Sequence, residues 1–119
     1  MLKKENRLKN RRAFSATYNN NNVVSDNSMI TYAGKEKTDK NCPTRVGFVV
    51  SKKVHKRATK RNRIKRLMRE SMRLYIKECG NFDTKFMSLV FVASTHLLNK
   101  NFADINKGMR KLLEVIENA

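Results

Sequence analysis

The strongest constraint in this sequence is a basic run of 23 residues from Ser51 to Arg73. It holds one acid, Glu70, against eleven basic residues: Lys52, Lys53, Lys56, Arg57, Lys60, Arg61, Arg63, Lys65, Arg66, Arg69 and Arg73. The run thus carries ten of the chain's seventeen net positive charges. Self-repulsion at this density destabilises a compact state unless an anion neutralises it. The run therefore indicates a polyanionic partner.

From about Thr59, a plausible N-cap, the run has good helix formers and neither Gly nor Pro. The apolar spacing predicts an inner face of Ile64, Leu67, Met68, Ser71, Leu74 and Tyr75. The opposite face is basic, with Asn62, Lys65, Arg66, Arg69 and Arg73. A solvated helix face would interleave Glu with Lys at i, i+4, and this one hardly does. Guanidinium groups bind phosphate bidentately and stack on bases, so the pattern favours a helix that binds RNA.

The residues KRNRIKR at 60–66, followed by Leu67, Arg69 and Glu70-Ser71, resemble the signature of the protein subunit of bacterial ribonuclease P. The lead-in RVGFVVSKK at 45–53 resembles the strand that precedes this signature in the family. The resemblance implies that this segment binds the catalytic RNA subunit, through Lys56, Arg57, Lys60, Arg61, Asn62, Arg63, Lys65, Arg66 and Arg69.

Two aromatic residues, Phe14 and Tyr18, are spaced i, i+4 in a short helix expected over Asn10 to Tyr18. The residues alone leave two interpretations open: the rings are core anchors, or they form an exposed platform on which bases stack. The resemblance favours the platform, because in the family two such aromatics line a cleft for the single-stranded 5′ leader of precursor tRNA. The family often has Phe at the second position. The expected leader site is Arg11, Arg12, Phe14, Tyr18, Tyr32, Lys52 and Lys53.

The rest of the chain predicts an α+β fold in the order α-β-β-β-α-β-α, with helices packed on a small mixed sheet. The expected strands are one or two within Val23 to Tyr32, one over Arg45 to Ser51, and one over Phe86 to Ala93, too apolar to have a wet face. Gly80 is expected to end the long helix. A final helix over Ala103 to Ile116 should bury Ile105, Met109, Leu112, Leu113 and Ile116. A strand–helix–strand crossover is right-handed by default, but the resemblance implies a left-handed one.

At 119 residues the chain should be a single RNA-binding domain, with residues 1–9 a mobile basic arm. No apolar run approaches the roughly 20 residues that span a bilayer, and no signal-like segment is visible. We therefore expect a cytoplasmic protein with no membrane partner. Cys42 and Cys79 are too isolated for a zinc site, and both are expected to be free thiols.

The sequence offers little for catalysis by the protein alone. His55 and His96 are the only candidate acid–base pair, and the ten acids are scattered rather than clustered for Mg²⁺. We assign no catalytic residue, metal ligand or bound cofactor. The resemblance implies that the RNA subunit hydrolyses precursor tRNA, with Mg²⁺ in the RNA-containing holoenzyme. The protein, a monomer there, would aid substrate binding and lower the metal requirement.

Two other functions share parts of this pattern. A ribosomal or other structural RNA-binding protein would have similar size, charge and fold type. A DNA-binding protein could use the Arg-rich helix for recognition, but no helix-turn-helix spacing or dimerising heptad supports it.

Overall fold

The computed structural model describes residues 7–20, 22–25, 29–38, 43–79, 84 and 86–117. The elements are α1 (Arg11–Asn19), β1 (Asn22–Ser25), β2 (Met29–Ala33), β3 (Arg45–Val49), α2 (Ala58–Cys79), β4 (Ser88–Ala93), the short 3-10 helix η2 (Thr95–Leu97) and α3 (Phe102–Glu117). The predicted α+β order is confirmed. In the described part of the chain, no helix is long and apolar enough to cross a membrane.

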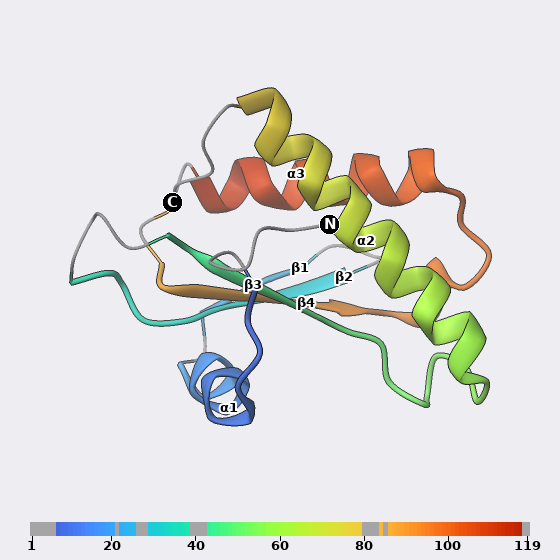
Figure 1. The fold of residues 1–119 in the computed structure, drawn as a ribbon, viewed down its shortest axis with the longest axis horizontal. Coiled ribbons are helices and arrows are strands. Elements are labelled where there is room, and N and C mark those ends of the chain that lie inside the picture. Colours follow the sequence, from blue (N-terminus) through green and yellow to red (C-terminus); the bar gives the residue numbers. More distant parts are fainter. Residues whose placement is uncertain are drawn as a thin grey trace.

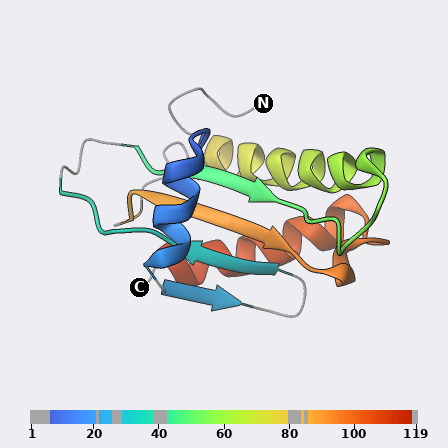
Figure 2. The same cartoon turned by 90° about the horizontal axis from the view of Figure 1, so that it is seen from below.

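The four strands form one mixed sheet in the order β1-β2-β4-β3. β4 runs parallel to β3 and antiparallel to β2, so the long helix α2 connects two neighbouring parallel strands. In Figure 2 α1 lies in front of the sheet, β3 and β4 point the same way, and α2 returns behind them. The path from β3 through α2 to β4 is therefore left-handed. The usual right-handed crossover does not occur here, and the left-handed crossover that the resemblance implies is confirmed.

The helices divide between the two faces of the sheet. α2 and α3 cover one face and α1 crosses part of the other (Figure 1). The core lies between the sheet and the α2–α3 layer, where Phe48 and Phe91 stack with ring centroids 5.8 Å apart. The predicted inner face of α3 is confirmed, since all five of its expected residues are buried. Of the expected inner face of α2, Leu67 and Leu74 are only half-buried.

The N-terminus of α2 differs from the prediction that Thr59 is its N-cap. The helix begins at Ala58, and the carbonyl of Arg57 accepts the first helical bond from the Arg61 N–H, at 3.2 Å. Thr59 therefore lies inside the first turn. Gly80, Cys42 and the side chain of Cys79 lie outside the described residues, so the helix stop and the free thiols stay predictions.

The last strand, β4, starts at Ser88 and has no exposed residue, as predicted for a strand without a wet face. Ser88 and Val92 are nonetheless only half-buried on the face that carries α1. The reason is coverage: α1 has nine residues and crosses only one end of the strands, as Figure 2 shows. The pattern of apolar residues could not indicate that this face lacks a full helical layer.

The expected mobile arm over residues 1–9 reaches into the described part at Arg7, Leu8 and Lys9. Two of them contact the sheet, whereas Lys9 is exposed. The Leu8 N–H donates to the Val46 carbonyl at 3.0 Å, Leu8 is buried, and Arg7 forms a parallel bridge with Val46. Arg7 and Leu8 therefore extend the sheet beyond the edge of β3, and the mobility of the arm stays a prediction.

Candidate nucleic-acid interface

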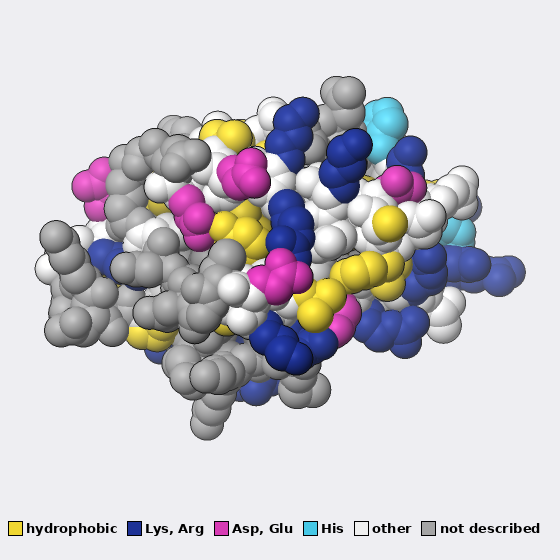
Figure 3. Space-filling view, turned by 90° about the horizontal axis from the view of Figure 1, so that it is seen from above, with side chains coloured by type: hydrophobic (Ala, Val, Ile, Leu, Met, Phe, Trp, Pro, Cys, Tyr) yellow, Lys and Arg dark blue, Asp and Glu magenta, His cyan; other side chains and the backbone are white. Residues whose placement is uncertain are grey.

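The outward side of α2 forms a basic groove of about 650 Å³, which we call the α2 groove. It is lined by Thr59, Asn62, Arg63, Arg66, Arg69 and Glu70. Asn62, Arg66 and Arg69 are exposed, as are Lys56, Arg57 and Lys60 before and at the start of the helix, while Lys65 is half-buried. Figure 3 shows Lys and Arg side chains gathered over the end of the molecule at which α2 begins. Of the predicted basic face, Asn62, Arg66 and Arg69 therefore line one groove, whereas Lys65 and Arg73 are half-buried and lie outside its lining.

Two arginines of the motif contact the protein itself. Arg61 Nη1 donates to the carbonyl oxygens of His55, at 3.0 Å, and Lys56, at 2.8 Å. The His55 ring supports the same turn, because its Nδ1 accepts from the Arg57 N–H at 3.0 Å. Arg63 Nη2 reaches the Lys100 carbonyl at 3.4 Å, near the start of α3. The bonds of Arg61 and His55 hold the loop before α2 against the helix. The sequence analysis did not assign this role to Arg61.

The one acid of the basic run pairs locally. Arg73 donates to Glu70 through Nε at 3.1 Å and through Nη2 at 2.5 Å. The hydrogen bond from Arg73, and secondarily its charge, lowers the pKa of Glu70. Because the pair is i, i+3 on the helix and Glu70 lines the α2 groove, it reduces the positive potential at one end of that groove.

On the other face of the sheet, Phe14 lies directly on β3. A Cβ built at Gly47 would come within 2.5 Å of the Phe14 ring atoms Cε1 and Cζ. Only glycine allows this close approach. Thr17 fixes the helix next to it: its Oγ1 lies 2.6 Å from Ser88 Oγ and also donates to the Ala13 carbonyl at 2.7 Å. Thr17 is the one buried residue of α1, so it anchors the helix while the aromatic rings stay half-buried.

Tyr18 and Tyr32 form an edge-to-face pair, with centroids 4.9 Å apart and planes at 81°. Burial of the Tyr18 phenol, and secondarily the neighbouring Tyr32, raises the pKa of Tyr18. Three of the residues predicted for the leader site, Phe14, Tyr18 and Tyr32, therefore meet on one face. Each ring of the aromatic pair packs on the sheet and also keeps an accessible surface, and the stacking of bases on it stays a prediction.

Beyond α1 this face continues as a row of half-buried aliphatic side chains. The register pairs Val92 with Val49 on one side and with Ile30 on the other. Lys52 and Lys53 are exposed in the turn that follows β3. Arg11 and Arg12 are exposed in the first turn of α1, where Asn10 Oδ1 caps the helix by accepting from the Arg12 N–H at 2.9 Å. We give the name α1 face to the aromatic residues Phe14, Tyr18 and Tyr32 together with the aliphatic row of Val49, Val92 and Ile30.

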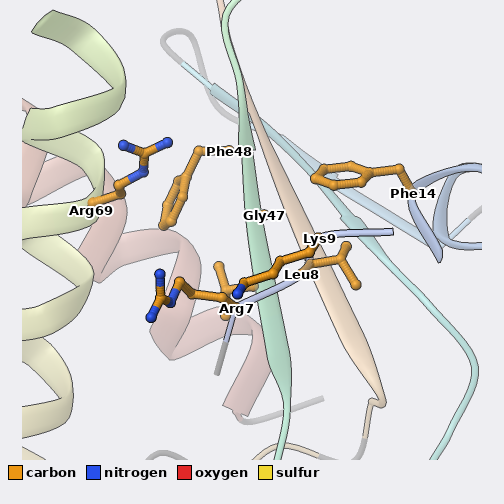
Figure 4. Close-up of a pocket in the computed structure, with 8 residues that line it drawn as sticks. Arg7, Leu8, Lys9, Phe14, Gly47, Phe48 and Arg69 are labelled. Atoms are coloured by element: carbon orange, nitrogen blue, oxygen red, sulfur yellow. The ribbon is translucent and has the colours of Figure 1, made fainter. Parts of the chain in front are cut away.

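A pocket of about 330 Å³ beside the outer edge of β3 joins the two surfaces. In Figure 4, Arg69 extends from α2 towards β3, Arg7 extends towards α2, the Phe48 ring sits between β3 and α2, and Phe14 lies across the strand. Lys9 also lines the pocket. The buried Arg7 Nε has no hydrogen-bond partner among the described residues. The sequence analysis did not single out Arg7 and Lys9. The segment that pairs with β3 is too short to show a periodic pattern of apolar residues.

The described residues contain no group of three or more His, Cys, Asp or Glu that could hold a metal ion. His55 and His96 are in separate surface segments, before α2 and in η2. His55 Nδ1 accepts a backbone hydrogen bond, and His96 Nδ1 lies 3.4 Å from Ser94 Oγ.

The geometry described above can be compared with known proteins. The family model described as Ribonuclease P matches residues 2–117. The Ribonuclease P protein component of Clostridium kluyveri is 35% identical over 111 residues, which cover 91% of each chain. That of a Synechococcus strain is 30% identical over 115 residues, covering 96% of this chain and 84% of the relative.

Two solved structures share the fold. The RNase P protein of Staphylococcus aureus aligns with a TM-score of 0.77 at 22% identity, covering 95% of this chain and 98% of that one. The RNase P protein of Thermotoga maritima aligns with a TM-score of 0.75 at 24% identity, covering 93% and 97%. With the family match over residues 2–117 and the curated relatives at 30–35% identity, this chain belongs to the ribonuclease P protein family.

Proposed function

We propose that this protein is the protein subunit of a ribonuclease P, which acts with a catalytic RNA to remove the 5′ leader of precursor tRNA. One observation carries the proposal: a 119-residue chain presents two surfaces of different chemistry on opposite sides of its sheet. The α2 groove is basic and polar, whereas the α1 face is aromatic and aliphatic. The relatives named Ribonuclease P protein component support the assignment.

The α2 groove suits the RNA subunit, because an exposed row of guanidinium and ammonium groups binds folded RNA through its phosphates. Asn62, Arg66 and Arg69 contact the RNA directly, together with Lys60 and Lys65. Arg61 acts differently, because its guanidinium already holds the loop that carries Lys56 and Arg57. It places these two cations beside the groove.

The α1 face suits a single strand. Phe14 and the Tyr18–Tyr32 pair offer ring surfaces to unstacked bases, and such stacking contributes about 1–3 kcal/mol per base. Lys52 and Lys53 neutralise the strand's phosphates where β3 ends, and Arg11 and Arg12 do so at the start of α1. These contacts do not use the hydrogen-bonding edges of the bases, so the α1 face can bind leaders of different sequence.

The pocket at the edge of β3 links the binding surface for the RNA subunit to the binding surface for the leader. Arg7 lines it from the segment before α1 and Arg69 lines it from α2. A phosphate there would pair with these two guanidinium groups and bring RNA on the α2 groove next to RNA on the α1 face. The protein thereby aligns substrate with the RNA subunit.

In this function the hydrolytic step belongs to the RNA subunit with its Mg²⁺. The protein raises substrate affinity and lowers the Mg²⁺ concentration that cleavage needs. It acts as a monomer in the cytoplasm, without a metal or cofactor of its own.

The test is reconstitution. The purified protein is mixed with a bacterial ribonuclease P RNA, and 5′ cleavage of precursor tRNA is followed at low Mg²⁺. We expect cleavage with both components and none with the protein alone. Cleavage of a defined phosphodiester by the RNA-free protein, abolished by His55→Ala or His96→Ala, would refute the proposal. So would a failure of the protein to lower the Mg²⁺ requirement.

A further inference from the structure

A second recess, of about 520 Å³, lies on the side of α1 away from Phe14 and Tyr18. At about 100° per residue, Ala13 and Ala16 project more than a quarter-turn from the two aromatic residues. These alanines form one wall. Met87 and Pro43 complete an apolar lining, and Lys35 and Arg45 add two cations. We call this the Met87 recess.

Three of its residues are fixed side by side through their backbones. The Met87 N–H donates to the Lys35 carbonyl at 2.8 Å, and the Arg45 N–H donates to the Met87 carbonyl at 3.0 Å. The order across the sheet is therefore Lys35, Met87, Arg45, with a thioether between two cations. Backbone bonds of this kind fix the spacing of the three residues before any ligand arrives, so the ordering cost on binding is confined to their side chains.

The side chains in this row have chemistry suited to a ligand. Met87 is 48% exposed, one of the three most exposed large hydrophobic residues described. A methionine sulfur makes favourable contacts with aromatic rings. Lys35 and Arg45 are exposed, and no carboxylate is among the described residues that line the recess. An apolar floor flanked by two uncompensated cations matches a planar base with a phosphate on each side.

The recess adjoins the proposed RNA surfaces. Leu8 lines both the Met87 recess and the pocket at the edge of β3 that Phe14 and Arg69 share. A single strand lying on the α1 face can therefore reach the recess around the N-terminal end of α1, along a path that includes Arg7 and Lys9. The volume is within the range of pockets that enclose small ligands.

We propose that the Met87 recess binds one unstacked nucleotide of the 5′ leader, farther from the cleavage site than the nucleotides on Phe14 and Tyr18. Its base lies against Met87 and Ala16, and its flanking phosphates lie at Lys35 and Arg45. This inference rests on the proposed function and extends it, because it predicts that leader length beyond the α1 face adds affinity.

The first experiment observes the recess directly. The full chain is labelled with ¹³C at its methionine methyl groups, the Met87 signal is assigned by its loss in Met87→Leu, and a single-stranded RNA pentanucleotide is added. We expect the Met87 methyl signal to shift while the signals of the buried Met29, Met68 and Met109 stay in place. An unmoved Met87 signal at saturating RNA would overturn the proposal.

The second experiment measures affinity for precursor tRNAs that share one mature sequence and carry short or long leaders. The double variant Lys35→Gln with Arg45→Gln should bind the long-leader substrate about 5- to 10-fold more weakly and the short-leader substrate as the wild type does. A matched control, Lys107→Gln with Lys111→Gln, removes the same charge from exposed positions on α3. It should change both substrates equally.

The outcomes separate this proposal from the proposed function. If Phe14→Ala weakens binding of all leaders and the Lys35–Arg45 variant shows no length dependence, the recess is refuted and the leader function stands. If neither variant affects leader binding, the function itself is refuted. Loss of affinity for the RNA subunit alone in the Lys35–Arg45 variant would also overturn the assignment to the leader. Melting curves of each variant exclude unfolding as the cause.

Discussion

Arg61 Nη1 lies 3.0 Å from the carbonyl oxygen of His55, so an arginine of the basic motif holds the loop that precedes its own helix. A second bond from the same atom reaches the Lys56 carbonyl at 2.8 Å. The motif therefore contains residues of two kinds. Some, such as Arg66, are exposed to solvent, and Arg61 fixes the loop beside them.

Arg61→Ala should lower the free energy of unfolding by about 1–2 kcal/mol, because hydrogen bonds to a charged group are lost from a partly buried site. Arg66→Ala should leave stability unchanged and reduce RNA affinity with a shallower salt dependence. Urea unfolding and RNA titrations at several salt concentrations check both variants. Equal stability of the two variants would contradict a positioning role for Arg61.

Gly47→Ala should displace Phe14 without altering that residue, because the new Cβ would meet the ring at 2.5 Å. Overpacking of this kind costs about 1–3 kcal/mol of stability. We expect weaker binding of precursor tRNA and unchanged binding of mature tRNA, which lacks a leader. Filter binding with the two tRNAs, alongside thermal melting, tests this. Equal losses for both tRNAs would place Phe14 outside the leader site.

Tyr18 should make stability fall at alkaline pH. Its folded pKa is raised above the ordinary value by burial, so its contribution is fully present below about pH 10 and is lost as pH rises through the folded pKa. Tyr18→Phe removes this dependence and keeps the ring for stacking. Urea unfolding of the wild type and of Tyr18→Phe from neutral to alkaline pH gives the difference between their free energies of unfolding. This difference separates the titration of Tyr18 from that of lysines, which titrate in the same pH range. A constant difference across that range would contradict the prediction.

Glu70→Gln should strengthen RNA binding, because it removes the only acid of the basic run and frees Arg73 beside the α2 groove. If Arg73 then contacts one more phosphate, the slope of log affinity against log salt should steepen by about 0.7–0.9. Titrations of the RNA subunit at several salt concentrations measure it. Glu114→Gln, an exposed acid on α3, makes the same change of charge and should leave the slope as it is.

Much of the fold was available from the sequence, because periodic patterns report local structure. The spacing of apolar residues located α2 and α3, and the aliphatic segments at 45–51 and 86–93 located the parallel pair β3 and β4. The density of Lys and Arg indicated a polyanion, and the motif at 60–66 indicated the family. Each of these signals lies within a short window of residues, so no contact between distant residues had to be known.

Tertiary structure alone decided how these pieces combine. The pairing of Leu8 with Val46, the seat of Phe14 on Gly47 and the row from Lys35 through Met87 to Arg45 each join residues distant in sequence. The left-handed crossover likewise depends on which face α2 covers, and residue physics favoured the opposite hand. The sequence determined which side chains are available, whereas packing against the sheet determined whether each one faces solvent, as Arg66 does, or supports the protein, as Arg61 does.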